Sequence, residues 1–203
     1  MNPHDLDRSK RAAVDHPIHD LLARRWSPRA FDERPVDREL LHQLFEAARW
    51  AASSFNEQPW RFLVAERQAE AEFSRMLECL SEGNRAWARR ASALAISVSK
   101  LAFDRTGKPN RHHAHDVGMA TANLAIQATA LGLHVHMMAG FDVEKARTTY
   151  GVPEGFDPLT AMAIGHLGPI EVLDERKQAR EREPRTRLPL TEVVFRERWG
   201  NPI

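Results

Sequence analysis

Hydrophobic residues recur at helical spacing in three segments of the chain. Between Asp37 and Ala52 the leucines, the phenylalanine and the alanines return every three or four residues, which predicts an amphipathic helix capped by Asp37. The same spacing predicts a second helix over residues 68–80 and a third over residues 113–131, which Gly132 ends. The third segment is apolar around most of its circumference and rich in small residues, so we expect it to be buried at the centre of the fold.

Short apolar runs between these helices predict strands, because they are too short for buried helices. The C-terminal run, residues 188–195, also has strand character and follows a highly charged segment, so it could join a sheet elsewhere, including that of a partner chain. Strands and helices alternate irregularly, which is typical of a mixed α/β layout. The four earlier strands are expected at residues 60–65, 93–99, 134–141 and 160–167.

The remaining segments are shorter and more polar. Residues 1–14 are expected to be frayed, and Pro17 is expected in the first turn of a short helix that ends before Pro28. The dipeptide at residues 83–84 is expected to end the second helix region. Residues 102–111 form a polar loop whose role the sequence leaves open.

Length and composition fit one domain over residues 1–203. The chain is 42% hydrophobic and 28% charged, which is ordinary for a globular protein. A formal net charge of +1 gives no global field to attract nucleic acid or an anionic membrane, and no run approaches the roughly 18 apolar residues that span a bilayer. Cys79 is the single cysteine, and the N-terminus lacks the apolar core of a secretion signal. We therefore expect a cytoplasmic protein that binds neither nucleic acid nor membranes.

Two basic groups are candidates for binding an anion. Arg25, Ser27 and Arg29 precede the first amphipathic helix, and they offer guanidinium forks and a hydroxyl group that suit a phosphate. Arg185 and Arg187 form a second basic pair before the last apolar run. From composition alone, solvated basic turns explain each group better than a binding site does.

A cluster of neutral donors and acceptors follows the same amphipathic helix. It contains Ser53, Ser54, Asn56 and Gln58 within one loop. Such a loop can bind the polar edge of a heterocycle through hydrogen bonds, and a plain connection between a helix and a strand explains it equally well.

Histidines gather at residues 112–116 and at His134 and His136, but their spacing is poor for a metal. Zinc needs at least three converging ligands, and His113 and His115 are badly placed on one helix to share an ion. We expect no metal site, and a histidine-rich helix start is the better interpretation. The sequence also lacks the motifs G-x-G-x-x-G, Walker A, G-x-S-x-G and H-E-x-x-H, which argues against a Rossmann dehydrogenase, an NTPase, an α/β-hydrolase and a zincin.

Taken together, these segments resemble the FMN-dependent nitroreductase family. The resemblance covers roughly residues 18–200, and the first and last motifs are the most characteristic. The motifs that carry it are RRWSPRAF, PVDRELLHQLFEAARWAASSFNEQPWRFLVA, GNRAWARRASALAISV, HDVGMATANLAIQATALGL, HMMAGFDVEKARTTYGVPEG, AIGHLG and RTRLPLTEVVF.

The resemblance implies an α+β fold with a central mixed sheet flanked by helices. It also implies a homodimer with an FMN site at each of two positions in the interface. The C-terminal arm, residues 170–203, would embrace the partner and exchange its last strand. In this picture the two ends of the first amphipathic helix serve different sites, so that a monomer would lose its cofactor.

The motif positions imply which residues bind FMN. The arginines and Ser27 of the first and last motifs would surround the phosphate, the ribityl chain and the N1/O2 edge. Residues 52–58 would come from the other subunit, Asn84 would bind the pyrimidine edge, and residues 138–140 would lie against the flavin. The flavin itself would carry the chemistry, with Arg29 near N1 and a backbone N–H of this last segment near N5. In chain order the implied residues are Arg25, Trp26, Ser27, Arg29, Ala52, Ser53, Ser54, Asn56, Gln58, Asn84, Trp87, Met138, Ala139, Gly140, Arg185 and Arg187.

The implied activity is an oxidoreductase with ping-pong hydride transfer. NADH or NADPH would reduce FMN, and a small electrophilic acceptor such as a nitro compound or quinone would then reoxidise it. Trp87 stands where some relatives have a lysine, and Ala139 where some have a glutamate, which leaves the substrate class open. The alternatives are a flavin-binding or sensing protein without turnover, a flavin enzyme for one specific metabolite, and a structural dimer without flavin.

Overall fold

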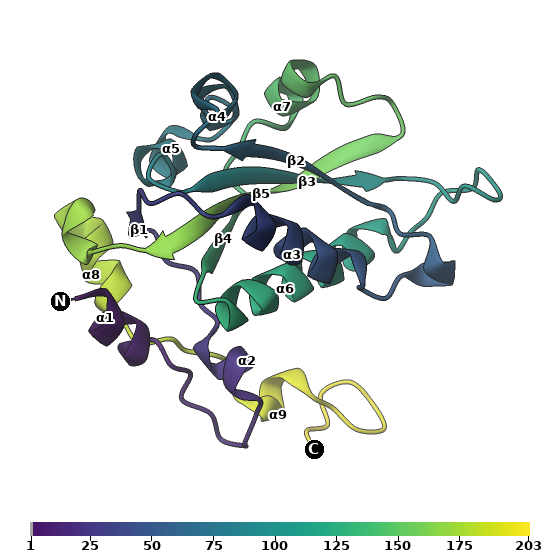
Figure 1. Ribbon diagram of the computed structural model, residues 1–203. Helices are drawn as coiled ribbons and strands as arrows, with labels where there is room; N and C mark the ends of the chain where they lie inside the picture. Colours follow the sequence, from purple (N-terminus) through teal and green to yellow (C-terminus); the bar gives the residue numbers. More distant parts are fainter. Residues whose placement is uncertain (1) are drawn as a thin grey trace.

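A five-stranded antiparallel sheet forms the middle of the protein in a computed structural model that describes residues 2–203 (Figure 1). The strand order is β1-β5-β3-β2, and β4 also pairs with β5, over residues that precede those paired with β1 along that strand. All the strand pairs within the described residues are antiparallel, so the expectation of a mixed sheet is corrected. The strands are β1 (Phe31–Asp32), β2 (Trp60–Glu66), β3 (Ala93–Lys100), β4 (His134–Met138) and β5 (Phe156–Leu167).

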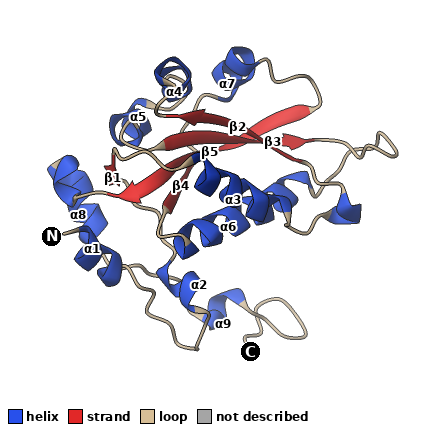
Figure 2. Cartoon of the chain, viewed as in Figure 1, coloured by secondary structure: helices blue, strands red, loops and turns tan. Residues whose placement is uncertain are grey.

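Helices cover both faces of this sheet (Figure 2). One face packs against α3 (Arg38–Arg49) and α6 (His113–Ala130), and the other against α4 (Glu70–Leu77), α5 (Glu82–Ala88) and α7 (Val143–Tyr150). Two hydrophobic cores result, one on each face, and β3 is buried along nearly its whole length because it lies between them. An apolar run without alternation is therefore what a strand in this central position requires.

The two helices on the first face form for the reasons that their sequences indicate. The Asp37 side chain accepts a hydrogen bond from the backbone of Glu39 at the start of α3, and Leu41 and Leu44 point into the core. Along α6 the small residues let α3 and the sheet approach closely, and Leu124 is fully buried. The expected burial of this helix is confirmed for one face only, because Gly118 and Ala122 on the other face are exposed.

The terminal segments of the chain lie beside and below the sheet in Figure 1, with the N-terminus at the left and the C-terminus at the bottom. Leu6 is fully buried against Trp26 and Ile170, so the N-terminal segment is a packed helix and not frayed as expected. The expected strand at 188–195 is also wrong, because a short helix forms there. The elements of this region are α1 (Pro3–Ser9), α2 (Asp20–Arg24), η2 (Ile170–Val172), α8 (Glu175–Arg182) and α9 (Leu190–Val193).

Two boundaries also differ from the expectations. Gly83 and Asn84 are expected from the sequence to end a helix, but they lie inside α5. This helix begins directly after its N-cap residue, Ser81. The strand β4 ends at Met138, and the following residues bend around the N-terminal end of α5. Within the described residues, no helix is long and apolar enough to cross a membrane.

Candidate functional site

A basic pocket lies where the segment between α2 and β1 meets the chain that follows α8. Its cavity has a volume of about 260 Å³. The structure thus brings together both basic groups that the sequence singled out, although about 160 residues separate them in the chain. The charged and hydroxyl side chains that line the cavity are Lys10, Arg25, Ser27, Arg29, Arg180, Glu181, Glu183, Arg185 and Arg187.

Three arginines in this pocket face one another without an acidic partner. Arg25 donates to the Ser27 hydroxyl at 3.1 Å, and Arg185 donates to two backbone carbonyls at 2.8 Å each. Within the described part of the chain, the side chain of Arg187 bonds only to the carbonyl of the preceding residue. None of the three forms an ion pair with a carboxylate among residues 2–203. Burial, and then repulsion by the neighbouring arginines, lowers the pKa of Arg25 and of Arg185. A bound anion would relieve both effects.

Arg29, in contrast, is held by a buried carboxylate. Glu181 on α8 is 2% exposed and accepts hydrogen bonds from the backbone N–H and from Nη1 of Arg29, each at 3.2 Å. Burial raises the pKa of Glu181, and the Arg29 charge opposes that shift. The sequence did not single out Glu181, because it lies in a run of charged residues that reads as solvated. Only packing against the 25–29 segment distinguishes it.

The two tryptophans predicted at the site place their rings in the core beneath it. Trp26 donates from Nε1 to Asp7 at 2.7 Å and thereby fastens α1 to the body. Trp87 is 2% exposed and lies between Phe31 and His136, whose ring centroids are 6.1 and 4.6 Å from its own. Trp26 also lines the basic cavity, whereas Trp87 belongs to the hydrophobic core.

His136 links the strand β4 to the basic segment. Its Nδ1 lies 2.9 Å from the carbonyl oxygen of Pro28, to which it donates in the neutral tautomer. Burial, together with the charges of Arg29 and Arg25, lowers the pKa of His136 to about 4. The ring is therefore uncharged near neutral pH, and it fixes the position of the 25–29 backbone.

The far end of β4 forms a close contact with α5. Asn84 donates from Nδ2 to the carbonyl oxygen of Gly140 at 3.0 Å, and the Ser81 N–H donates to the same oxygen at 3.0 Å. A Cβ at Gly140 would stand 2.7 Å from Asn84 Nδ2 and 2.9 Å from Ser81 Oγ, so only glycine fits there without displacement. Met138 is buried and Ala139 is exposed. The structure therefore places Asn84 beside Gly140, and the binding of a flavin by these residues stays a prediction.

The polar loop after α3 lies apart from the basic pocket within one chain. It includes η1 (Ser54–Asn56) at the right of Figure 1, whereas α2 and α8 lie toward the bottom and the left. Ala52 is exposed, Gln58 N–H donates to Ser53 Oγ at 3.0 Å, and the amide of Gln58 donates to the Asn56 carbonyl at 3.2 Å. These side chains therefore do not complete the basic pocket of their own chain.

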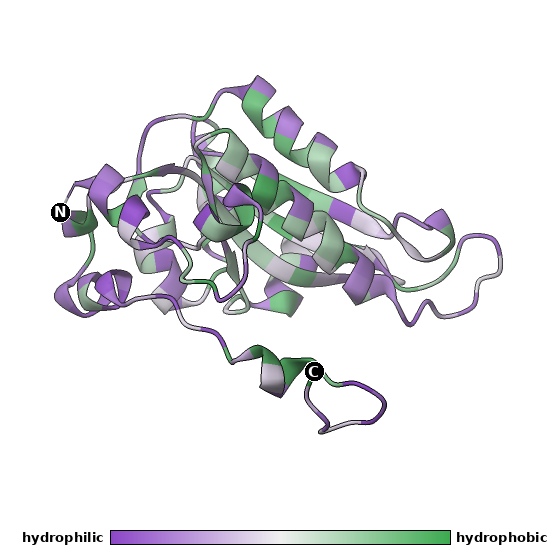
Figure 3. Cartoon of the chain, turned by 90° about the horizontal axis from the view of Figure 1, so that it is seen from below, coloured by the Kyte–Doolittle hydropathy of each residue, from purple (hydrophilic) through white to green (hydrophobic). Residues whose placement is uncertain are grey.

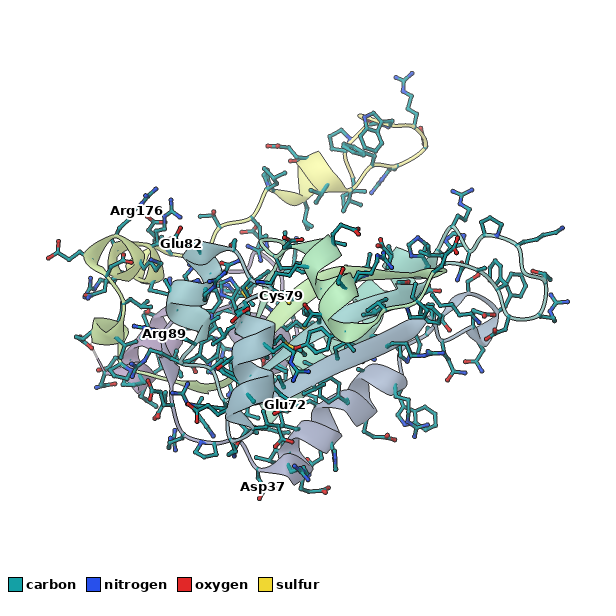
Figure 4. The ribbon with its side chains drawn as sticks, turned by 90° about the horizontal axis from the view of Figure 1, so that it is seen from above. Asp37, Glu72, Cys79, Glu82, Arg89 and Arg176 are labelled. Carbon is teal, nitrogen blue, oxygen red and sulfur yellow. The ribbon has the colours of Figure 1, made fainter. Side chains whose placement is uncertain are left out.

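The remaining candidates for metal binding or nucleophilic chemistry have structural partners. His113 Nδ1 lies 3.0 Å from the Ser99 hydroxyl, and His115 Nδ1 lies 3.2 Å from Asp116. Within residues 2–203, no cluster of three or more histidine, cysteine or acidic side chains is arranged to hold a metal. Cys79 lies toward the middle of the molecule in Figure 4, and burial raises the pKa of its thiol. A raised pKa disfavours the reactive thiolate.

Comparisons with known proteins agree on one family. The model of the nitroreductase family matches residues 22–166. An uncharacterised protein of Mycolicibacterium smegmatis is 39% identical over 150 residues, which is 70% of this chain and 99% of that protein. A Ralstonia nicotianae protein, provisionally named an NADH dehydrogenase/NAD(P)H nitroreductase, is 30% identical over 141 residues, 61% of this chain and 71% of that one.

Solved structures show the same fold. A crystal structure described as an oxidoreductase containing FMN is 35% identical and superposes with a TM-score of 0.89, covering 95% of this chain and 98% of that one. A Desulfovibrio desulfuricans structure in complex with FMN has a TM-score of 0.68 at 23% identity, covering 92% of this chain and 99% of that one. At that lower identity the second likeness concerns the fold alone.

Proposed function

The chain belongs to the nitroreductase family, and from this premise we propose that it is an FMN-dependent oxidoreductase that uses NADH or NADPH to reduce a small electrophilic acceptor. The observation that carries the proposal is the convergence of Arg25, Arg185 and Arg187 without an acidic partner among residues 2–203. Guanidinium groups in this arrangement suit a phosphate dianion, because each can donate two hydrogen bonds to it. The FMN-containing relative at 35% identity supports the same cofactor.

Different residues of the pocket would bind different parts of the cofactor. The three arginines and Ser27 would hold the phosphate, and Arg29 would face the N1/O2 edge of the flavin. Bound FMN supplies the redox chemistry, accepting two electrons from NADH or NADPH and passing them to nitro compounds or quinones in a ping-pong cycle. Residues 138–140 would lie against the ring, with Asn84 positioning them through its bond to the Gly140 carbonyl.

Glu181 and His136 would prepare the pocket before any ligand arrives. The two hydrogen bonds from Arg29 to Glu181 restrict the guanidinium to one orientation, so less side-chain entropy is lost on binding. His136 hydrogen-bonds to the Pro28 carbonyl. Because its ring stays neutral, it adds no positive charge next to the 25–29 backbone. The protein thus contributes orientation and charge, and it excludes water from the buried side of the pocket.

The complete enzyme would be a cytoplasmic homodimer in which residues 1–203 form one domain. Apolar side chains on α2 and on the C-terminal arm support this proposal, because Leu22, Leu188 and Val193 are more than half exposed and Trp199 is 90% exposed. Figure 3 shows the arm, with the hydrophobic α9, extending away from the rest of the chain. An arm of this kind is suited to embrace a partner. The Ser53–Gln58 loop of one chain would then reach the flavin of the other.

The absorption spectrum of the purified protein tests the proposal. We expect a yellow protein whose flavin bands bleach under anaerobic conditions on addition of NADH or NADPH and return on addition of a quinone. A yellow protein that neither cofactor bleaches would instead be a flavin-binding protein without turnover. A colourless protein that FMN does not reconstitute would refute the proposal altogether. Sedimentation of the same sample measures whether the flavin is held by a dimer.

A further inference from the structure

The loop after α3 displays an aromatic ring in a strained position. Phe55 is 85% exposed and has a φ angle of 53°, in the left-handed region that a bulky residue rarely adopts. Asn56 and Gln58 also have positive φ angles, of 55° and 51°. Each such residue costs on the order of 1 kcal/mol, and strain of this kind clusters at functional sites. A connection between a helix and a strand does not by itself require three such residues.

Hydrogen bonds from neighbouring elements hold this loop in place. The Ser54 N–H donates to the buried carboxylate of Asp116 on α6 at 3.0 Å. On the other side, Glu57 accepts from the Asp104 N–H at 2.6 Å, and Lys100 lies between these two acidic side chains. The loop is therefore anchored on both sides, and Phe55 is held out toward solvent and not merely left there by a flexible chain.

The loop that the sequence left unexplained packs beside Phe55. Residues 102–111 fold back as a tight turn, in which the Phe103 N–H donates to the Lys108 carbonyl at 2.9 Å and Gly107 adopts a φ angle of 64°. The rings of Phe55 and Phe103 meet edge to face with centroids 5.9 Å apart. Both segments lie at the right-hand end of the molecule in Figure 1. They enclose a cavity of about 330 Å³, which has room for a single-ring ligand.

The rim of this cavity carries a net positive charge. Arg105 and Lys108 line it and are exposed, and neither forms an ion pair with an acidic side chain within residues 2–203. The nearby acidic groups, Glu57 and Asp104, are both engaged by Lys100. A ligand in the cavity would therefore meet two aromatic rings and two cations whose charges are available.

We infer that Phe55, Phe103, Arg105 and Lys108 form the binding site for the electron acceptor, and that the preferred acceptor is a single aromatic ring with a carboxylate or similar anionic group. The rings would contact the acceptor, and the cations would select its charge. This inference rests on the proposed function, because it places the Ser53–Gln58 loop at the partner's flavin. For a nitrobenzoate, NADH or NADPH supplies two electrons and one proton, solvent supplies a second proton, and the nitro group becomes a nitroso group with release of water.

Paired acceptors that differ only in charge test the selectivity. The ratio of kcat/KM for 4-nitrobenzoate to that for nitrobenzene should fall about fivefold to tenfold in the double variant Arg105→Gln/Lys108→Gln, because two partly exposed charge pairs are lost. Raising the salt concentration should lower the wild-type ratio and leave the ratio of the double variant nearly constant. Arg38→Gln/Arg75→Gln is the matched control, since it removes two exposed arginines elsewhere and should keep the wild-type ratio.

A binding measurement without turnover separates this inference from the proposed function. Saturation-transfer NMR on the oxidised protein, without NADH or NADPH, should detect 4-nitrobenzoate bound to the wild type and much less of it bound to Phe55→Ala. If this signal is present but the flavin is not bleached by either dinucleotide, the oxidoreductase proposal fails and the site takes an aromatic anion for another purpose.

Two results would overturn the inference itself. An unchanged selectivity ratio in the Arg105→Gln/Lys108→Gln variant, with normal circular dichroism, would show that these cations do not select the acceptor. If the same variant had a higher KM for NADPH and an unchanged KM for 4-nitrobenzoate, the site would bind the dinucleotide and not the acceptor.

Discussion

Removing the Arg187 charge should weaken FMN binding while stabilising the flavin-free protein. Among residues 2–203 the guanidinium of Arg187 bonds only to the carbonyl of Thr186, so Arg187→Gln removes a charge without breaking a tertiary hydrogen bond there. Arg187 also lowers the pKa of Arg25 and Arg185, which means that the three cations repel one another when no anion is present. A general loss of structure would lower both the affinity for FMN and the stability of the flavin-free protein. A lower affinity together with a higher stability therefore identifies an electrostatic role of Arg187 in binding.

The magnitude follows from exposure and charge. A charge-assisted hydrogen bond contributes about 1.5–3 kcal/mol when shielded, and solvent around the exposed Arg187 reduces this to about 1 kcal/mol. That change corresponds to about a fivefold increase in the Kd for FMN. Relief of the repulsion should raise the free energy of unfolding of the flavin-free protein by only a few tenths of a kcal/mol.

The assay combines a flavin titration with urea unfolding. Quenching of FMN fluorescence on titration into flavin-free protein measures Kd, and urea unfolding of the same sample measures stability. Arg187→Lys is the control variant, because it keeps the charge and should lose less affinity than Arg187→Gln. The reasoning is refuted if Arg187→Gln binds FMN with the wild-type Kd, or if the lysine variant binds as weakly as the glutamine variant.

Three further changes test the architecture around the pocket. Gly140→Ala should displace the Asn84 side chain, because the new Cβ would stand 2.7 Å from its Nδ2, and the loss of the hydrogen bond to the Gly140 carbonyl should lower the free energy of unfolding by about 1 kcal/mol; urea denaturation measures this. The pKa of His136 is about 4 in the folded protein and 6.5 in the unfolded chain, so its stabilising contribution is complete above pH 6.5 and is lost as the pH falls toward 4. The free energy of unfolding should fall by about 3 kcal/mol over this range, and this decrease should be absent from His136→Phe. Trp26→Phe removes the hydrogen bond to Asp7, so hydrogen exchange in α1 should accelerate more than exchange in β3.

Local patterns predicted most of the elements correctly. The helix expected over residues 37–52 is α3, and the helix expected over 113–131 is α6, because a stripe of apolar side chains at helical spacing has one stable way to be buried. The apolar run at 93–99 is a strand for a similar reason, since it lies between two cores. These predictions depend on neighbours in sequence, which is why they hold.

The errors occur where distant contacts decide the structure. Leu6 has polar neighbours in the sequence, and these predict a frayed chain end. In the structure Trp26 and Ile170 bury it and stabilise α1. The run at 188–195 has the composition of a strand, yet among residues 2–203 it makes only a single bridge, from Phe195 to Pro202, and Leu190–Val193 form α9. β-structure needs a partner that its own sequence does not supply.

The candidate site divides in the same way. The basic and polar clusters could be named from the sequence because their residue types suit a phosphate and a heterocycle, and the motifs identified the family. Their arrangement in space could not be predicted: Arg25 and Arg187 converge in one pocket, whereas the loop after α3 contributes Phe55 to a different pocket. Glu181, which holds Arg29, looked like any other charge in a solvated helix.

The sequence by itself determined the local elements, the family and the residue types available for an anion. Only the tertiary structure decided which charges meet without partners, which carboxylate is buried against Arg29, and that Phe55 and Phe103 share a cavity. The physical reason is range: hydrophobic periodicity and capping act over a few residues, whereas desolvation, charge repulsion and ring contacts depend on groups that the fold brings together from distant parts of the chain.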